Sequence, residues 1–253
     1  NGSSWTEIAE INTTRIRAGA SGIQTSALYF GGSAAPGNQA LTELWNGSSW
    51  TEVNDLNSAR AYVGSAGTLS TAALIFGGGS VNTESYNGSS WTEVNNLVTA
   101  RQYAAVCGLT STAAMVVGGY GIPADSPYSA GPGSRVGITE IWDGTSWTHV
   151  SGTLALGRIE SALSGTTTEA VIAGGNTGDP APPTVTTATA ESWDGTSWTS
   201  VASMSDVQKN GGSSSSGGNT TSIIMGGSPG VVADTEEWTV PATTYATKTF
   251  TAS

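Results

Sequence analysis

Five short, continuously apolar runs recur along the chain, and each one ends at a pair of glycines. The runs are ALYF at 27–30, ALIF at 73–76, MVV at 115–117, AVIA at 170–173 and SIIM at 222–225. An apolar run of this length is typical of a strand buried on both faces. The glycine pair predicts a backbone with positive φ, or a close approach to a neighbouring element, where the strand ends.

A second pattern, SSWTE or a close variant, also recurs five times, with its tryptophan at Trp5, Trp50, Trp91, Trp147 and Trp198. Before the last four copies, Glu-x-Trp or Glu-x-Tyr leads directly into Asn-Gly or Asp-Gly. Such a dipeptide between two β-favouring runs predicts a hairpin. The intervals between tryptophans suit a repeat of four strands, as in a propeller blade.

Helical periodicity is absent, so we predict an all-β fold: a five-bladed β-propeller of four-stranded blades over residues 1–240. The chain opens on an expected fourth strand at residues 4–8, whereas the last copy stops at its third strand near Trp238. We expect the N-terminal strand to close the ring by completing that last blade. Residues 241–253 form an extended tail, or an extra strand at 245–253 that completes the last blade itself.

The repeated arginine, glycine pair, Glu-x-aromatic and tryptophan resemble the kelch repeat and the related repeats of the galactose oxidase central domain. The resemblance covers nearly the whole chain and implies kelch-like blades. Because kelch-like propellers include enzymes, adaptors and adhesins, it implies no single activity. The Ser/Thr/Gly-rich NGSSWTE strings are also similar to kelch-like repeats in structural proteins of tailed bacteriophages, which implies a displayed virion component.

The composition excludes several classes of function. A net charge of -11 with only 8 Lys and Arg provides no basic patch for a nucleic acid. The longest apolar runs are far shorter than a membrane-spanning helix, so no membrane insertion is expected. With 1 His and 1 Cys, the chain cannot assemble the copper site of the galactose oxidases. We expect no metal and no cofactor.

The reactive residues have ordinary interpretations in the repeat register. His149 takes the outer-strand position held by Glu52 in an earlier copy, and Cys107 takes a small-residue position of an inner strand. A glycosidase would need two carboxylates across a cleft. Nothing in the sequence pairs the off-register acids, so we expect no catalytic residues and no enzyme activity.

A basic residue follows each tryptophan by ten or eleven positions, at Arg15, Arg60, Arg101, Arg158 and Lys209. One hypothesis places these residues around one mouth of the central channel, where they would hold an anionic or hydroxyl-rich ligand. The alternative is a set of repeated structural ion pairs with the glutamates of the Glu-x-aromatic strands.

The loops between second and third strands differ most between copies, and they are expected on the same face as the basic residues. Loops held by a rigid scaffold commonly carry recognition. The candidate contact residues are Tyr120, Asp125, Tyr128, Arg135 and Asp179. Tyrosine and arginine are favoured interface anchors.

We therefore expect a non-catalytic binding or structural module, displayed on a virion or outside a cell. Its variable face would recognise a glycan or protein on a cell surface. The alternatives are a secreted carbohydrate-active enzyme or lectin, and a purely structural subunit that docks on neighbouring virion subunits.

Overall fold

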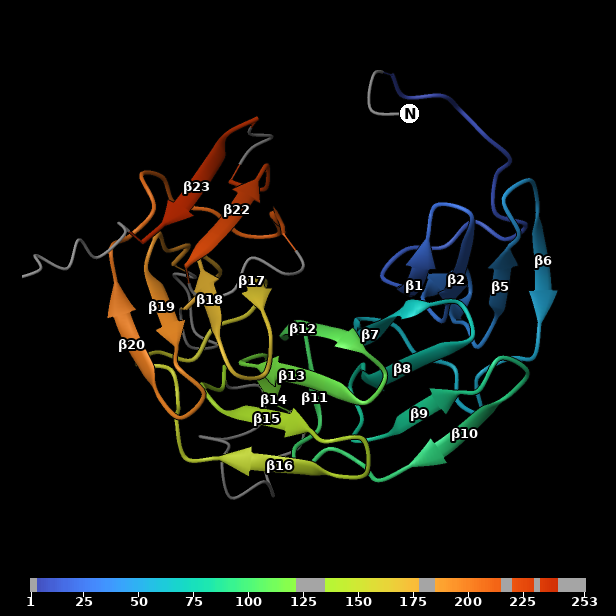
Figure 1. Ribbon diagram of the computed structural model, residues 1–253, viewed down its shortest axis with the longest axis horizontal. Helices are drawn as coiled ribbons and strands as arrows, with labels where there is room; N and C mark the ends of the chain where they lie inside the picture. The colour runs from blue at the N-terminus through green and yellow to red at the C-terminus, as the bar shows by residue number, and fades with distance from the viewer. Residues whose placement is uncertain (1–3, 122–134, 178–184, 215–219, 230–232, 241–253) are drawn as a thin grey trace, which may run out of the picture.

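The computed structural model describes residues 4–121, 135–177, 185–214, 220–229 and 233–240. Every regular element in these ranges is a β-strand, so the predicted all-β class is confirmed, and no described helix is available to cross a membrane. Four four-stranded antiparallel sheets are followed by a three-stranded one, which we number sheets 1 to 5 in chain order. Figure 1 shows them side by side along an arc around a central opening.

The strands of sheets 1 and 2 are β1 (Gly19–Ile23), β2 (Ser26–Phe30), β5 (Thr42–Trp45), β6 (Trp50–Val53), β7 (Val63–Leu69), β8 (Ala72–Gly77), β9 (Thr83–Tyr86) and β10 (Trp91–Val94). Sheets 3 and 4 contain β12 (Ala105–Thr110), β13 (Ala113–Val117), β15 (Thr139–Trp142), β16 (Trp147–Val150), β17 (Ala162–Gly165), β18 (Ala170–Ala173), β19 (Ala190–Trp193) and β20 (Trp198–Val201). Sheet 5 contains β21 (Gly212–Ser213), β22 (Thr221–Met225) and β23 (Thr235–Thr239). Two small ribbons pair β3 (Ser33–Ala34) with β4 (Gly37–Asn38), and β11 (Arg101–Gln102) with β14 (Tyr120–Gly121).

Each sheet runs from an inner first strand to an outer last strand. The first strands β1, β7, β12 and β17 lie next to one another around the opening, whereas β6, β10, β16 and β20 lie on the outside (Figure 1). The inner strands are rich in small residues because the apolar second strand packs closely against them. A Cβ on Gly19, for example, would lie 2.5 Å from the ring of Phe30.

The predicted hairpins between third and fourth strands are confirmed. Trp45 pairs with Trp50 across the first of them, and Asn46 Oδ1 accepts hydrogen bonds from the amides of Ser48 and Ser49 at 2.9 and 3.0 Å. Asp143 and Asp194 accept equivalent bonds in later turns. The short polar side chain thus satisfies the turn backbone in each copy.

The core is divided among the interfaces between successive sheets. The interface of sheets 1 and 2 buries Leu28, Phe30, Leu56, Ala73, Ile75, Tyr86 and Trp91. Similar clusters fill the interfaces of sheets 2 with 3 and 3 with 4. The apolar second strands contribute to two such clusters at once, which is why their sequences are continuously apolar.

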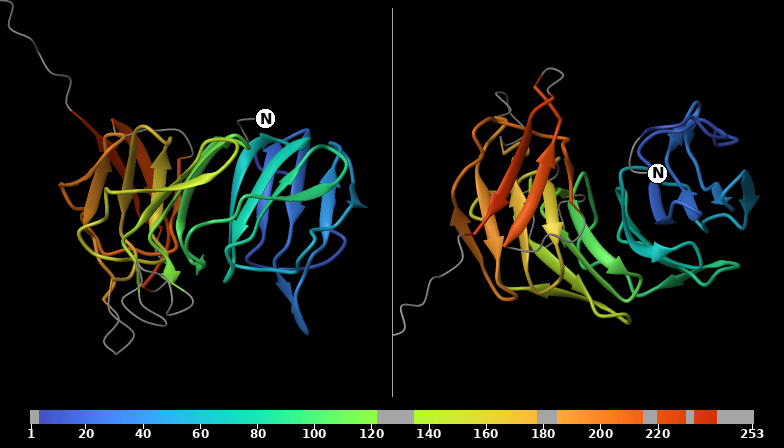
Figure 2. Two further views of the ribbon diagram at one scale, coloured as in Figure 1. Left: turned by 90° about the horizontal axis from the view of Figure 1, so that it is seen from below. Right: turned by 45° about the horizontal axis from the view of Figure 1, so that its top comes forward.

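The arc is open between sheets 1 and 5. Residues 4–8 form no strand, and Trp5 is fully exposed, so the expected closing strand is not formed in this structure. Figure 1 and the tilted view in Figure 2 show the gap that separates the N-terminal segment from β23. A strand needs a partner for its backbone groups, and the edge it would join lies across this gap. Residues 241–253 lie outside the described residues.

Candidate functional site

The four register arginines lie inside the protein, in ion pairs with the glutamate of a third strand. The pairs are Arg15 with Glu43, Arg60 with Glu84, Arg101 with Glu140 and Arg158 with Glu191. All eight side chains are at most 4% exposed. The alternative of repeated ion pairs therefore describes these arginines, and their guanidinium groups are not presented at the channel mouth.

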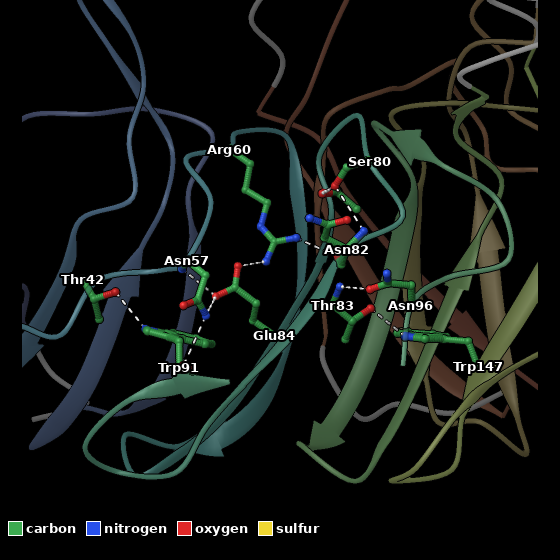
Figure 3. Close-up of polar contacts among 11 residues, drawn as sticks. Thr42, Asn57, Arg60, Ser80, Asn82, Thr83, Glu84, Trp91, Asn96 and Trp147 are labelled. Atoms are coloured by element: carbon green, nitrogen blue, oxygen red, sulfur yellow. Dashed lines mark hydrogen bonds and ion pairs between the residues drawn. The ribbon is translucent and has the colours of Figure 1, made fainter. Parts of the chain in front are cut away.

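Arg60 illustrates the arrangement (Figure 3). Its guanidinium contacts Glu84 Oε1 and donates to the carbonyl of Asn82 at 2.7 Å, while Glu84 Oε2 accepts from the backbone and side-chain amides of Asn57, both at 2.8 Å. The carbonyl of Arg60 accepts from Gly32 of the preceding sheet at 2.8 Å, which Gly32 permits through its φ of 98°. The pairs of Arg60, Arg101 and Arg158 thus each tie a connection to two successive sheets.

Burial and the ion-pair partners shift the pKa values of Glu43 and Arg101 in opposite directions. Burial by itself raises the pKa of Glu43, but hydrogen bonds from Arg15 and from the amides of Asn12 and Thr13 outweigh it, and the net pKa is lowered. Burial lowers the pKa of Arg101, and Glu140 opposes that shift. A buried pair whose carboxylate accepts bonds from both an arginine and a backbone amide serves as scaffold and offers little to a ligand.

The fifth basic residue departs from the repeat. The carbonyl of Gln208 accepts a hydrogen bond from the amide of Gly175 at 2.7 Å. One sheet earlier, the carbonyl of Arg158 accepts the equivalent bond from Gly119. Gln208 therefore occupies the arginine position of sheet 5, and assigning Lys209 to that position is wrong. Lys209 instead binds Glu160 at 2.9 Å with 27% of its side chain exposed.

The residues two positions after each arginine, or after Gln208, form a different set. They are Arg17, Tyr62, Tyr103, Glu160 and Asn210, which we call the mouth residues. All five have φ between 56° and 62°, the left-handed region that non-glycine residues rarely adopt. Such strain at equivalent positions is a common mark of functional sites.

Backbone bonds join mouth residues of neighbouring sheets. Tyr62 donates to the carbonyl of Arg17 at 3.0 Å, Glu160 to that of Tyr103 at 3.1 Å, and Asn210 to that of Glu160 at 2.8 Å. These bonds fix the left-handed conformation and place five different side chains next to one another along the arc.

The side chains also interact. The Arg17 guanidinium lies 4.3 Å from the centre of the Tyr62 ring, whose centre lies 4.3 Å from that of Tyr103. Burial and the neighbouring Tyr62 raise the pKa of Tyr103 to about 12, so its hydroxyl stays protonated. The row combines a cation, two aromatic rings, a carboxylate and an amide, and can offer stacking surfaces together with hydrogen-bond donors and acceptors.

The variable loops lie beside the mouth residues. Ile16 pairs with Ser33, Ile159 with Asn176, and Lys209 with Ser228, so the segments after the glycine pairs adjoin the connections that carry the mouth.

The candidate contact residues lie partly in this region. Tyr120 pairs with Gln102 and Arg135, and two buried guanidinium nitrogens of Arg135 have no hydrogen-bond partner among the described residues. Asp125, Tyr128 and Asp179 lie outside the described residues.

The remaining reactive residues occupy ordinary positions. Cys107 is buried in β12, and burial raises the pKa of its thiol to about 12. His149 lies in the outer strand β16, opposite Glu140. In the described ranges, no three His, Cys, Asp or Glu side chains gather as metal ligands.

Sequence reasoning missed the mouth residues because their identities differ from copy to copy. The available signal was their fixed offset of two from the arginine, in RIR, RAY, RQY and RIE. Comparison with known families gives no further guide, since no family model and no curated protein matches this chain.

Proposed function

We propose that the protein is a five-bladed kelch-like propeller, closed by its N-terminal strand, that binds a surface glycan at the mouth residues without catalysis. The observation that carries this proposal is the row formed by Arg17, Tyr62 and Tyr103, beside the variable loops. Sugar rings present apolar C–H faces and many hydroxyls, and tyrosine offers both a ring to stack on and a hydroxyl to bond.

The polar members of the row add specificity. Glu160 accepts hydrogen bonds from sugar hydroxyls, and the amide of Asn210 both donates and accepts. Lys209 neutralises Glu160, so the row does not repel a neutral or weakly acidic sugar. Arg17 and Arg135 provide hydrogen-bond donors for a carboxylate substituent, which favours glycans that carry a carboxylate over neutral glycans.

A binding role without catalysis suits the chemistry of the described residues. Glu43, Glu84, Glu140 and Glu191 are occupied by buried arginines, and the Cys107 thiol is buried and protonated. We also propose display on a virion or outside a cell, on the basis of the acidic, lysine-poor composition and the likeness of the repeats to phage structural proteins.

A glycan panel tests the proposal with the wild-type chain and two variants. Binding of wild-type protein to a defined set of glycans, lost in Tyr103→Ala and retained in Ser89→Ala, is the expected result. Ser89 is a suitable control because it lies in a hairpin turn of sheet 2, away from the mouth. Binding to cell-surface protein alone, with no glycan bound, would contradict it.

A further inference from the structure

Three interfaces between sheets contain a tryptophan from an outer strand. Trp91, Trp147 and Trp198 each donate the indole N–H to a threonine hydroxyl of the preceding sheet, at 3.0, 2.9 and 2.9 Å. Trp91 also packs against Phe30 of the preceding sheet at 4.8 Å and against Tyr86 of its own third strand at 5.0 Å. The indole is thus a regular part of the core between sheets.

The interface of sheets 4 and 5 has the equivalent positions, but none of its described residues is a tryptophan from an outer strand of sheet 5. In the first interface the residues around Trp91 include Leu28, Phe30, Leu56, Ile75 and Tyr86. The register places Val171, Ala173, Met204, Ile224 and Trp238 at these positions between sheets 4 and 5. These five residues line a pocket of about 280 Å³. The pocket therefore lies where the fifth tryptophan of the repeat is expected.

The edge beside this pocket is also incomplete. Sheet 5 ends at β23, whose described partner is β22, whereas sheets 1 to 4 each continue to a fourth strand. Trp5 carries the same flanking residues as Trp50 and Trp91, yet its side chain is fully exposed.

The connection after Trp5 is anchored as in the other copies. The Asn12 amide donates to Glu43 at 2.6 Å, and its side chain donates to the Trp50 carbonyl at 3.2 Å. Asn57 makes the equivalent bonds to Glu84 and Trp91. The strand before Asn57 is the outer strand of the sheet adjoining sheet 2. Residues 4–8 therefore correspond to the outer strand of a sheet adjoining sheet 1.

We propose that residues 4–8 of the same chain dock on β23 as its fourth strand, with Trp5 in the pocket. This inference rests on the proposed closure of the propeller and is independent of the glycan. The register of the other hairpins places Trp5 opposite Trp238 and Thr6 opposite Glu237. Ala190 occupies the position where the other interfaces have a threonine. The Trp5 indole would therefore be held by apolar contacts, without a hydrogen bond from its N–H to a threonine hydroxyl.

Closure also completes the interface between sheets 5 and 1. Thr235 holds the position of Thr42 and Thr83, whose hydroxyls receive an indole N–H. Trp50 is the tryptophan that would reach Thr235, and Met225, now 45% exposed, holds the position of Phe30 beside it. Closing the gap between sheets 5 and 1 would therefore bury the exposed side chains of Trp5 and Met225 and the half-buried side chain of Trp50.

A disulfide between Thr6→Cys and Glu237→Cys tests the docking, since both positions are exposed and Cys107 is buried. The expected result is a cross-link within one chain on mild oxidation, formed as readily as in the control pair Leu44→Cys with Thr51→Cys, whose residues are partners in sheet 1. Thr6→Cys with Thr199→Cys, on the outer strand of sheet 4, should remain reduced.

Adding Trp5→Ala to the first pair should slow the cross-link about tenfold, because the apolar burial that holds the strand is lost. Absence of the cross-link in a chain that folds and forms the control disulfide would overturn the docking. A cross-link between two chains would assign the strand to a second copy, and an unchanged rate with Trp5→Ala would remove Trp5 from the pocket. Each result is read without a glycan, so failure here is distinct from failure of glycan binding.

Discussion

Arg101 and Glu140 form a completely buried ion pair at the junction of sheets 2 and 3. The guanidinium also donates to the carbonyls of Gly118 and Ile138, at 3.1 and 3.3 Å, and the carboxylate accepts from the amides of Val98 and Thr99, at 2.7 and 3.2 Å. The carbonyl of Arg101 in turn accepts from Gly78 and Gly79 at 3.0 and 3.1 Å. One residue thus connects the loop between two sheets to the backbone of both, through its carbonyl to sheet 2 and its guanidinium to sheet 3.

Arg101→Met leaves the Glu140 carboxylate buried without its cation. The expected loss is about 3–5 kcal/mol in the free energy of unfolding, measured in urea. Lys209→Met removes an ion pair that is partly exposed, and it should cost below about 1 kcal/mol. Equal losses in the two variants would show that burial of the arginine pair has no special role.

Gln208→Arg should stabilise the protein. Gln208 is 2% exposed, and neither its amide nitrogen nor its oxygen has a hydrogen-bond partner among the described residues, while Glu236 stands at the position of the paired glutamates. An arginine would remove the unsatisfied amide and restore the ion pair, with a gain of about 1–3 kcal/mol in thermal or urea unfolding. Gln208→Leu removes the amide alone, so a gain as large as that of the arginine would exclude a contribution from Glu236.

The side chain of Asp194 should make the stability of its hairpin depend on pH in the acidic range. Hydrogen bonds from Ser197 and Thr196 lower its pKa to about 2, below the ordinary value of about 3.9 for an unfolded chain. Its contribution is therefore present above about pH 4 and is lost as the pH falls towards 2.

Asp194→Asn keeps the turn bonds, as Asn46 and Asn87 do, without this titration. As the pH falls from 4 to 2, the melting temperature of the wild type should fall more than that of the variant. These limits bracket the pKa of Asp194 in the unfolded chain and its pKa in the folded protein. Asn46→Asp should show the opposite trend, and parallel pH profiles for all three proteins would contradict the account.

Gly118→Ala should be strongly destabilising. Gly118 has a φ of 67°, and a Cβ there would lie 2.5 Å from the carbonyl oxygen of Arg158. A loss of about 1–3 kcal/mol is expected in thermal unfolding. Gly37→Ala, where no atom lies within 4 Å of the added Cβ, should change stability by less than about 0.5 kcal/mol.

The repeat made much of this fold predictable. The hairpin between Glu43 and Trp50, the buried second strands and the position of the glycine pairs all follow from residues that recur in every copy. Lys209 was misassigned because the spacing from tryptophan to arginine is ten or eleven residues, and only backbone bonds distinguish it from Gln208. The mouth residues were not predicted, because they share a left-handed backbone conformation and not a residue type, as Tyr62 and Glu160 show.

The central claim, that the mouth residues bind a glycan, is tested most directly by titrating the best-bound glycan of the panel into wild type, Tyr62→Ala and Tyr62→Phe. The predicted result is a dissociation constant raised about two- to tenfold in Tyr62→Ala, since one stacked ring contributes about 0.5–1.5 kcal/mol. Tyr62→Phe keeps the ring and should bind close to wild type. An unchanged dissociation constant in Tyr62→Ala would contradict the claim.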